Sequence, residues 1–477
     1  MESSILTELR ILQSLLSGPA WLVGGSVRDL LLAKKEISDI DLLTPSGSET
    51  LARGFADRIK GSFFFLDEER KITRVVKSVE GRSLQFDFTN FEGPDLKADL
   101  GRRDFTINAM ALELNRFLDT PEPDGVIDLF NGRDDVRNKQ IRLTREGVLD
   151  EDPLRMLRAV RFAATLGFTI DEKTGQQTLS RAALAARPAP ERVRDELFLI
   201  LSERGAGDSL LLMDSLGLLQ VLLPEVGALG GFAPGMYHAH DVKTHSLKAV
   251  GHVDGVLDDL ARIAPEQGHL VLAHLEERLE HLVSRKAALR FACLLHDIAK
   301  PESFTRDEQG HIHFYGHDNL GALKAAEICR RFRLSRHSET LVTSVIKQHM
   351  RLFNLSVPSG PGKNAMYRYC RDLGDALPES LLLSQADARA TYDVMPREKF
   401  TDTEQSMSVV LAYYYEKFLR AEARPLLTGH DLIGRGFRPG PRFHEILNDV
   451  KERQASGTLK NRQDALAYLD TIRPVDS

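Results

Sequence analysis

Histidine is absent from the first 237 residues of this 477-residue chain, and all 15 histidines lie at or after His238. Chemistry in the N-terminal half must therefore use carboxylates, arginines and glycines, whereas imidazole chemistry belongs to the second half. Cysteine is also scarce, because only Cys293, Cys329 and Cys370 are present and no two have the spacing of a metal site. This usage fits a reducing compartment and predicts that the three thiols are packing residues.

Long apolar runs and an excess of basic charge are missing as well. No run approaches the roughly 20 apolar residues of a membrane-spanning helix, and the N-terminus lacks the core of a signal peptide. We therefore expect a cytoplasmic protein with no membrane partner. The formal net charge is −6, so any contact with RNA or DNA must use a local basic patch. The length predicts two to four domains.

Two aspartates separated by one residue follow a glycine pair in WLVGGSVRDLLLAKKEISDIDLLT, residues 21–44. WLVGG is typical of a buried strand that enters a glycine turn, VRDLLLAK of a helix, and DIDLLT of a second strand. Side chains at i and i+2 point to the same face of a strand, so Asp39 and Asp41 can hold a divalent cation together. Two Mg²⁺ ions roughly 3.5–4 Å apart would activate an attacking hydroxyl and neutralise a leaving pyrophosphate.

The residues around this carboxylate pair suit a nucleotide triphosphate. Gly24 and Gly25 let backbone N–H groups approach an anion at a helix N-terminus, and Arg28 adds charge for the phosphates. Asp87 is flanked by apolar residues in QFDFT, and we interpret it as a third member of the metal site, with a structural ion pair as the alternative. Each feature alone is more often a plain turn or a solvated edge, but their combination favours a nucleotide and metal site.

Strand patterns continue to about residue 140 and then stop. FFFLDEE, KITRVVKSV and SLQFDFTNF are typical of strands, with a turn at residues 80–82 between the last two. The first 140 residues are therefore α/β, with a sheet of about four or five strands. Apolar residues recur at helical spacing after about Arg145, so the remainder is predicted to be helical. The glycine-rich residues 228–236 mark a boundary.

The glycine–aspartate stretch resembles the head domain of the class II tRNA nucleotidyltransferase/poly(A) polymerase family, in the DNA polymerase β-like superfamily. GRRDFTINAMAL (101–112) is similar to its ribose- and phosphate-reading motif, DLFNG (128–132) to its link segment, EDPLRMLRAVRF (151–162) to its base-reading helix and PERVRDEL (190–197) to its neck motif. The resemblance implies a template-independent RNA nucleotidyltransferase that uses ATP and CTP to add CMP and/or AMP to the tRNA 3′ end, releasing pyrophosphate.

The resemblance also implies roles for individual residues of the ribose- and phosphate-reading motif. Arg102 and Arg103 are candidates for contact with the triphosphate and RNA. Asp104 is a candidate acceptor for a ribose hydroxyl, and Asn108 a candidate for orienting the loop.

The base-reading motif carries a carboxylate and a guanidinium three residues apart, Asp152 and Arg155, which we expect on one helix face. A carboxylate accepts from an exocyclic amine while a guanidinium donates to a ring nitrogen, so this pair could select C and A without a template. Arg158 and Arg161 continue the face toward phosphate or RNA. The alternative is an amphipathic helix with salt bridges.

Histidines and aspartates of the second half occur in the order of an HD-superfamily metal phosphohydrolase, which they resemble. The core set implied is His245, His296, Asp297 and Asp387, with further ligands or a general acid in His317 and His349. Imidazole and carboxylate ligands suit Mn, Ni, Fe or Zn better than Mg, and a bound metal could activate water for phosphate-ester hydrolysis. The alternative is a helical RNA-binding body without turnover.

Four domains follow from these motifs: a nucleotidyltransferase head (1–143), a helical neck that binds RNA (144–230), an HD domain (237–400) and a helical tail (401–477). Activity restricted to A, to CC or to poly(A) tails stays open. The poly(A) activity is less favoured, because the stretch before RRDFT lacks an obvious basic GRRF-type segment. From other classes, an HD phosphohydrolase with an RNA-binding head and a non-catalytic RNA-binding protein are the alternatives.

Overall fold

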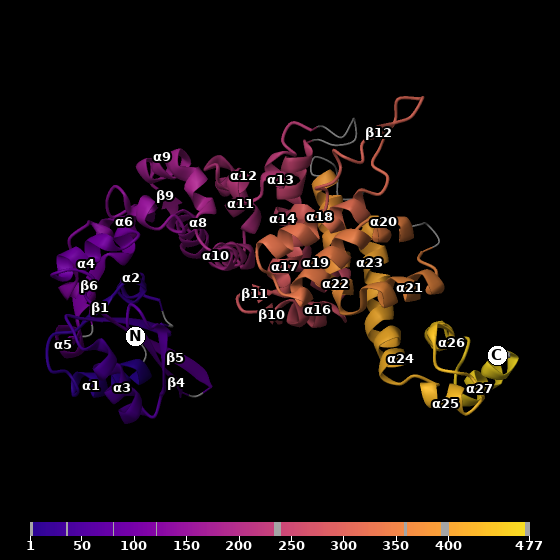
Figure 1. Ribbon diagram of the computed structural model, residues 1–477, viewed down its shortest axis with the longest axis horizontal. Coiled ribbons are helices and arrows are strands. Elements are labelled where there is room, and N and C mark those ends of the chain that lie inside the picture. The colour runs from indigo at the N-terminus through magenta and orange to yellow at the C-terminus, as the bar shows by residue number, and fades with distance from the viewer. Residues whose placement is uncertain are drawn as a thin grey trace. The chain divides into compact units, whose positions relative to one another are not determined.

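The structure is a computed structural model that describes residues 3–34, 37–79, 81–120, 122–232, 240–356, 360–392 and 400–472. The chain divides into two units, one formed by residues 1–188 with 215–218 and the other by residues 189–214 with 219–477 (Figure 1). The division falls inside the segment predicted as the neck. The glycine-rich boundary lies partly outside the described residues, at 233–239, and the four domain limits stay predictions.

A seven-stranded sheet organises the first unit, in the order β3-β4-β5-β2-β1-β6-β7. Its strands are β1 (Trp21–Val23), β2 (Asp39–Thr44), β3 (Ser62–Asp67), β4 (Ile72–Val79), β5 (Arg82–Asn90), β6 (Met110–Glu113) and β7 (Ile127–Asp128). Only β2 and β5 pair in parallel, and the other neighbours are antiparallel. The expected four or five strands were too few, because β6 and β7 are too short to leave a periodic pattern.

Helices cover this sheet and continue beyond it. They are α1 (Ser3–Gln13), α2 (Gly25–Leu31), α3 (Ser48–Ile59), α4 (Leu96–Arg102), α5 (Leu114–Asp119), α6 (Gly132–Asn138), α7 (Val148–Glu151), α8 (Arg155–Leu166) and α9 (Glu172–Arg181). The fully buried Phe55 of α3 packs on β5, with ring centroids 5.0 Å from Phe86 and 5.8 Å from Phe88. This aromatic core fixes β5 beside β2, the strand that carries the aspartate pair.

The second unit is helical, apart from two short hairpins, β10 (Arg278–Glu280) with β11 (Val283–Ser284) and β12 (Thr305–Arg306) with β13 (Ile312–His313). Five of its helices surround the histidine cluster: α14 (Val242–Asp258), α17 (Arg285–Leu295), α18 (His317–Arg331), α19 (Arg336–Gln348) and α22 (Leu377–Thr391). The chain ends in α25 (Gly429–Ile433), α26 (Pro441–Ala455) and α27 (Arg462–Thr471), which share an apolar core of their own. The predicted α/β head followed by helical parts is confirmed.

Two expectations from composition can be compared with the structure. All three cysteines are buried and free of disulfides, as expected of packing residues, and burial raises the pKa of Cys329 and of Cys370 to about 12. Within the described residues, none of the helices has the length and apolar character needed to cross a membrane.

Candidate functional sites

The glycine turn between β1 and α2 touches the carboxylate of Asp41. Gly24 has a φ of 64°, and a Cβ there would lie 2.9 Å from Asp41 Oδ2 and 3.0 Å from Arg103 Nη1. The backbone N–H of Gly25 donates to Asp41 Oδ2 at 3.2 Å. Any larger residue at position 24 would meet both strain and a clash, so the turn has to be glycine.

Ser26, which the sequence analysis missed, ties the helix start to the aspartate strand. Its Oγ accepts from the backbone N–H of Asp41 at 2.7 Å and donates to the backbone carbonyl of Asp39 at 3.2 Å. The side chain is buried, so these bonds fix β2 against the first turn of α2. A serine directly after a glycine pair at a helix start was the available signal.

The pKa of both aspartates of the pair is raised, although the side chain of Asp39 is exposed and that of Asp41 is half-buried. Desolvation is the largest cause for Asp39 and for Asp41, and each carboxylate is also raised by Asp87. Arg74 opposes the shift at Asp39, and Arg103 opposes it at Asp41. Carboxylates held close together with raised pKa values are stabilised in their charged form by a cation, as expected of a metal site.

Asp87 stands directly beside Asp41, its register partner across the parallel strands β2 and β5. Its carboxylate accepts two hydrogen bonds from Arg74, from Nε at 2.6 Å and from Nη2 at 2.7 Å. The structure thus brings Asp87 to the aspartate pair and also gives it the ion pair that was the alternative. Its role in metal binding stays a prediction.

Arg28 is engaged inside the protein. Its side chain is 9% exposed and donates to Asp29 and to Asn108 Oδ1, each at 2.8 Å. The guanidinium also lies over the ring of Phe162, 5.3 Å from the centroid. Asn108, expected to orient the motif loop, therefore also orients Arg28.

Asp104 is the centre of a buried network. It accepts from the backbone N–H of Phe105 at 2.8 Å, from Asn108 Nδ2 at 3.1 Å and from Arg158 Nε at 2.9 Å. Burial alone would raise the pKa of Asp104, but Arg158 and these hydrogen bonds outweigh it and lower the pKa. Asp104 is therefore a charged acceptor, and Arg158 is engaged by it.

The base-reading pair differs from expectation in one respect. Helix α8 begins at Arg155, and Asp152 precedes it as the extended cap of α7, so the expectation of one shared helix face was wrong. The intervening Pro153 explains this, because the residue before a proline avoids helical conformation. Arg155 donates to the backbone carbonyls of Arg102 at 2.8 Å and Val148 at 3.2 Å, which fixes its direction.

The remaining arginines lie toward the surface of the head. Arg103 pairs with Asp99 at 3.2 Å and approaches Gly24, whereas Arg102 is 3.5 Å from Glu92. Arg161 lies 4.4 Å from the centroid of the Phe162 ring. Their predicted contacts with nucleotide and RNA stay predictions.

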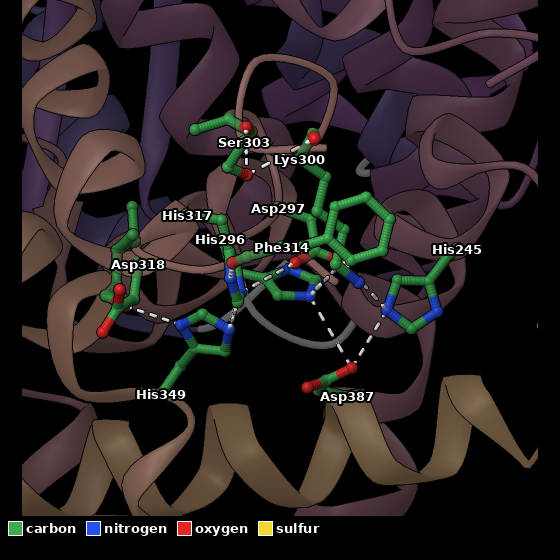
Figure 2. A network of polar contacts seen from close by, with 12 residues as sticks. His245, His296, Asp297, Lys300, Ser303, Phe314, His317, Asp318, His349 and Asp387 are labelled. Atoms are coloured by element: carbon green, nitrogen blue, oxygen red, sulfur yellow. Dashed lines mark hydrogen bonds and ion pairs between the residues drawn. The ribbon is translucent and has the colours of Figure 1, made fainter. Parts of the chain in front are cut away.

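A second cluster lies in the helical unit, where side chains from five helices or helix ends converge (Figure 2). They are His245 on α14, His296 and Asp297 after α17, His317 at the start of α18, His349 after α19 and Asp387 on α22. All six are buried or nearly so. The structure thus assembles every residue that the HD resemblance implied.

Three of these histidines are held in the same way. His296, His317 and His349 each direct Nδ1 at the backbone carbonyl three residues earlier, at 2.7–2.8 Å. A carbonyl only accepts, so Nδ1 carries the proton in each ring and a neutral ring has its lone pair on Nε2. Such an outer hydrogen bond is typical of histidines that bind metal through Nε2.

Two groups of possible metal ligands share Asp297. The first contains His245 and His296, whose Nε2 atoms lie 3.6 and 3.3 Å from Asp297 Oδ2. The second contains His317 and His349, whose Nε2 atoms lie 3.3 Å from each other. Asp387 adds a carboxylate oxygen 2.9 Å from His245 Nε2.

The electrostatics of the cluster favour a cation. Burial lowers the pKa of His296, but Asp297 and Asp387 outweigh it and raise the pKa to about 10. Burial, with the charge of His296, lowers the pKa of His349 to about 4. His296 Nε2 is buried without a hydrogen bond of good geometry, so the donor set fits a bound transition metal.

A cavity of about 690 Å³ opens onto this cluster. Asp297, His317 and Asp387 line it, together with Lys300 and Tyr315, which the sequence analysis missed. Lys300 Nζ lies 2.6 Å from Asp297 Oδ2. The spacing HDIAK, one helical turn after the aspartate, was the available signal for the lysine.

Three family models match the chain. A poly A polymerase head domain covers residues 20–142, a probable RNA- and SrmB-binding site of polymerase A covers 167–229, and an HD domain covers 250–392. The head model spans the aspartate pair and Asp87, and the HD model spans the second cluster apart from His245.

Curated relatives match almost the whole chain. An A-adding tRNA nucleotidyltransferase of Deinococcus radiodurans is 33% identical over 94% of this chain and 94% of its own. A CC-adding tRNA nucleotidyltransferase of Thermus thermophilus is also 33% identical, over 94% of this chain and 93% of its own. A solved CCA-adding enzyme of Thermotoga maritima, complexed with tRNA, shares the fold with a TM-score of 0.64 at 21% identity, covering 99% of this chain and 96% of its own. The chain belongs to the tRNA nucleotidyltransferase/poly(A) polymerase family and is a nucleotidyltransferase.

Proposed function

We propose that this nucleotidyltransferase adds CMP and/or AMP to the 3′ end of tRNA and releases pyrophosphate, with ATP and CTP as substrates. The observation that carries the proposal is the turn of Gly24 and Gly25 against Asp41, on the strand that also carries Asp39. The relatives that match more than nine-tenths of the chain act on tRNA by name, and their activities support the choice of acceptor.

The reaction needs positioning and charge rather than covalent catalysis. Asp39 and Asp41 would hold Mg²⁺, which when bound lowers the energy of the developing charge on the phosphates. Gly24 and Gly25 let the chain approach the triphosphate, and Arg103 lies beside them. Arg102 supplies further positive charge for phosphate or RNA.

Recognition of the nucleotide would fall to the polar side chains of the ribose-reading and base-reading motifs. Asp152 and Arg155 would read the base, and Asp104 would accept from a ribose hydroxyl. Arg158 keeps Asp104 charged, and Asn108 holds Arg28. Arg161, on the same helix as Arg155, would meet RNA or phosphate.

Within this function, a specialised enzyme is favoured over one that completes the whole CCA end. Curated relatives that are 30–33% identical and match more than nine-tenths of both chains are named A-adding or CC-adding, whereas the CCA-adding enzyme of Thermotoga maritima reaches that coverage at only 21% identity. Relatives named multifunctional CCA protein match only 66–70% of this chain. Addition of CC alone or of the terminal A alone is therefore the narrower proposal.

Incorporation of each labelled nucleotide tests these proposals directly. Purified chain with Mg²⁺ is given CTP, ATP or both, and tRNA ending at the discriminator base, at C or at CC, with an unrelated RNA as control. CC on the bare end, or a single A on the CC end, identifies a specialised enzyme; CC followed by A identifies a full CCA enzyme. Long A tails on any RNA identify a poly(A) polymerase, and no incorporation contradicts the proposal.

For the helical unit, we propose a metal-dependent phosphohydrolase site. His245, His296, Asp297 and Asp387 would hold one transition metal such as Mn, Ni, Fe or Zn, while His317 and His349 would hold a second through the shared Asp297. The Nε2 atoms of His317 and His349 lie 3.3 Å apart while each Nδ1 is held by a backbone carbonyl, so both rings aim a ligand nitrogen at one point near Asp297, which supports the second ion. Bound metal would supply a nucleophilic hydroxide from water.

Metal analysis and phosphatase assays test this second site. The purified chain is expected to retain transition metal after dialysis and to hydrolyse phosphomonoesters when Mn²⁺ or Ni²⁺ is supplied. A chain without either property would leave a helical RNA-binding body as the better reading. A cytoplasmic location stays a prediction for both activities.

A further inference from the structure

The hairpin β12–β13 forms one rim of the cavity over the HD cluster and ends beside an exposed aromatic side chain. Tyr315 is 76% exposed and lines the cavity together with His313. The two rings are stacked, with centroids 5.0 Å apart and an angle of 12° between their planes. A ring that exposes so much surface offers its outer side to a second flat ring.

Internal hydrogen bonds order this stack before any ligand arrives. His313 Nε2 donates to Asp307 Oδ2 at 3.0 Å, and the strands pair Thr305 with His313. Asp307 also accepts from the backbone N–H of His311 at 2.8 Å. The imidazole of His313 is therefore fixed in orientation, and it presents the tyrosine ring at a defined angle.

Phe314, which lies between His313 and Tyr315 in the sequence, packs against other side chains of the helical unit and so anchors the hairpin. Phe314 lies 6.1 Å from the ring of Phe304 and 5.6 Å from Lys300 Nζ. Lys300 is only 8% exposed and places its ammonium group beside Asp297, at the inner side of the cavity. An aromatic surface at the rim and positive charge near the candidate metal ligands thus share one cavity.

We propose that Tyr315, supported by His313, is a platform for the base of a nucleoside phosphate whose phosphate group reaches Lys300 and the HD cluster. This inference rests on the proposed phosphohydrolase site and assigns the side chains that would select a substrate with a base. The oxygen of water attacks phosphorus, the ester P–O bond breaks, and the leaving alkoxide of the nucleoside takes up the proton that the water releases. The products are inorganic phosphate and a nucleoside or an RNA end, so no oxidant or reductant is needed.

The test compares substrates with and without a base on the full-length chain loaded with Mn²⁺. The substrates are adenosine 5′-monophosphate, glycerol 2-phosphate and a short RNA that ends in a 3′-phosphate. Y315A should raise KM for the adenylate on the order of 10-fold or more with kcat nearly unchanged, because stacking on one side chain binds the base and not the reacting atoms. Y315F should match the unaltered chain, and L323A, which removes another exposed apolar side chain of the same unit, should do the same.

The outcomes separate the platform from the hydrolase. An equal effect of Y315A on glycerol 2-phosphate, or no effect on either substrate, overturns the platform. A KM effect confined to the RNA identifies an RNA end rather than a free nucleotide as the source of the base. If the unaltered chain hydrolyses none of the three, the hydrolase proposal fails, and equilibrium dialysis of the adenylate then decides the platform: Y315A should lose one bound nucleotide per chain that Y315F keeps, and equal binding overturns the inference.

Discussion

The two candidate sites of this chain offer ligands for a cation in opposite ways. In the head, Asp39 lies at the exposed start of β2, and the carboxylate of Asp41 is reached by the backbone of a glycine turn. In the helical unit, six side chains converge in the interior, and three imidazoles are oriented by backbone carbonyls. The first arrangement suits an ion that arrives and leaves with a triphosphate, and the second suits a resident ion.

Removing the head carboxylates should have the largest effect. The double variant D39A/D41A should lose at least about 10³-fold in nucleotide incorporation, because no other described group on that face of β2 replaces both ligands. Phosphomonoester hydrolysis should be unchanged, and D57N, at an exposed aspartate of α3, serves as the matched control. Simultaneous loss of both activities would contradict two independent sites.

Substitution of Asp297, which both groups of candidate ligands share, tests the site in the helical unit. D297N keeps the shape of the side chain but removes its charge, so the chain should lose both bound metals and its phosphatase activity. Incorporation with Mg²⁺ should stay within about twofold of the unaltered chain, since the head lacks histidine and uses its own ligands. Elemental analysis after dialysis gives the metal content, and retention of full metal would contradict the proposed ligand.

The number of metals can be sharpened with a single imidazole. H317A should leave the group of His245 and His296 intact and reduce the metal content from two ions per chain to one. H337A removes an exposed histidine of α19 and should leave the content at two. If the unaltered chain binds only one ion, the proposed second metal site is contradicted and the first is retained.

Steric contact and backbone strain can be separated at two glycines of the head. G24A places a methyl group 2.9 Å from Asp41 Oδ2 at a φ of 64°, so incorporation should fall about 10–100-fold. Gly47 has a φ of 77° with no atom within 4 Å of the added Cβ, so G47A should cost only about 1–2 kcal/mol of unfolding free energy. Equal loss of incorporation in both variants would show that strain, and not the contact with Asp41, is responsible.

The smallest effect is expected at Arg74. R74A removes the positive charge that competes with a cation for the carboxylate of Asp87. If Asp87 binds metal, the variant should bind Mg²⁺ more tightly, and the half-saturating Mg²⁺ concentration should fall roughly two- to fivefold. A titration of incorporation against Mg²⁺ measures this shift. An unchanged Mg²⁺ requirement with a lower melting temperature would assign Asp87 to a structural ion pair.

Sequence patterns predicted the structural features that are decided by a few neighbouring residues, and they missed those that are decided by contacts between distant residues. The glycine turn, the strand of Asp39 and the α/β head followed by helices could be predicted, because period and turn chemistry lie within a few residues. Strands β6 and β7 were missed, since their pairing is decided by neighbours distant in sequence. Asp152 was placed in a helix that Pro153 prevents.

Residues that act through contacts across the fold were the hardest to find. Ser26 binds backbone atoms 13 and 15 residues away, and Arg74 acts through its bond to Asp87 on the neighbouring strand. The HD cluster draws on side chains up to 142 residues apart. Only the resemblance to the HD superfamily placed the side chains of this cluster together before the structure did.

Metal binding by the imidazoles of His317 and His349 would also change the thermal stability of the helical unit. A metal held by these side chains would bind the folded state and not the unfolded chain, so the folded helical unit would gain about 2.7 kcal/mol when free metal reaches 100 times its dissociation constant. With Mg²⁺ held at a saturating concentration, the proposed carboxylate site of the head would already be occupied and would gain little from that ion. Thermal unfolding in rising Mn²⁺, at this fixed Mg²⁺ concentration, should therefore raise the melting temperature of the helical unit while that of the head stays fixed. The stability of the helical unit would then depend on the concentration of metal around the protein.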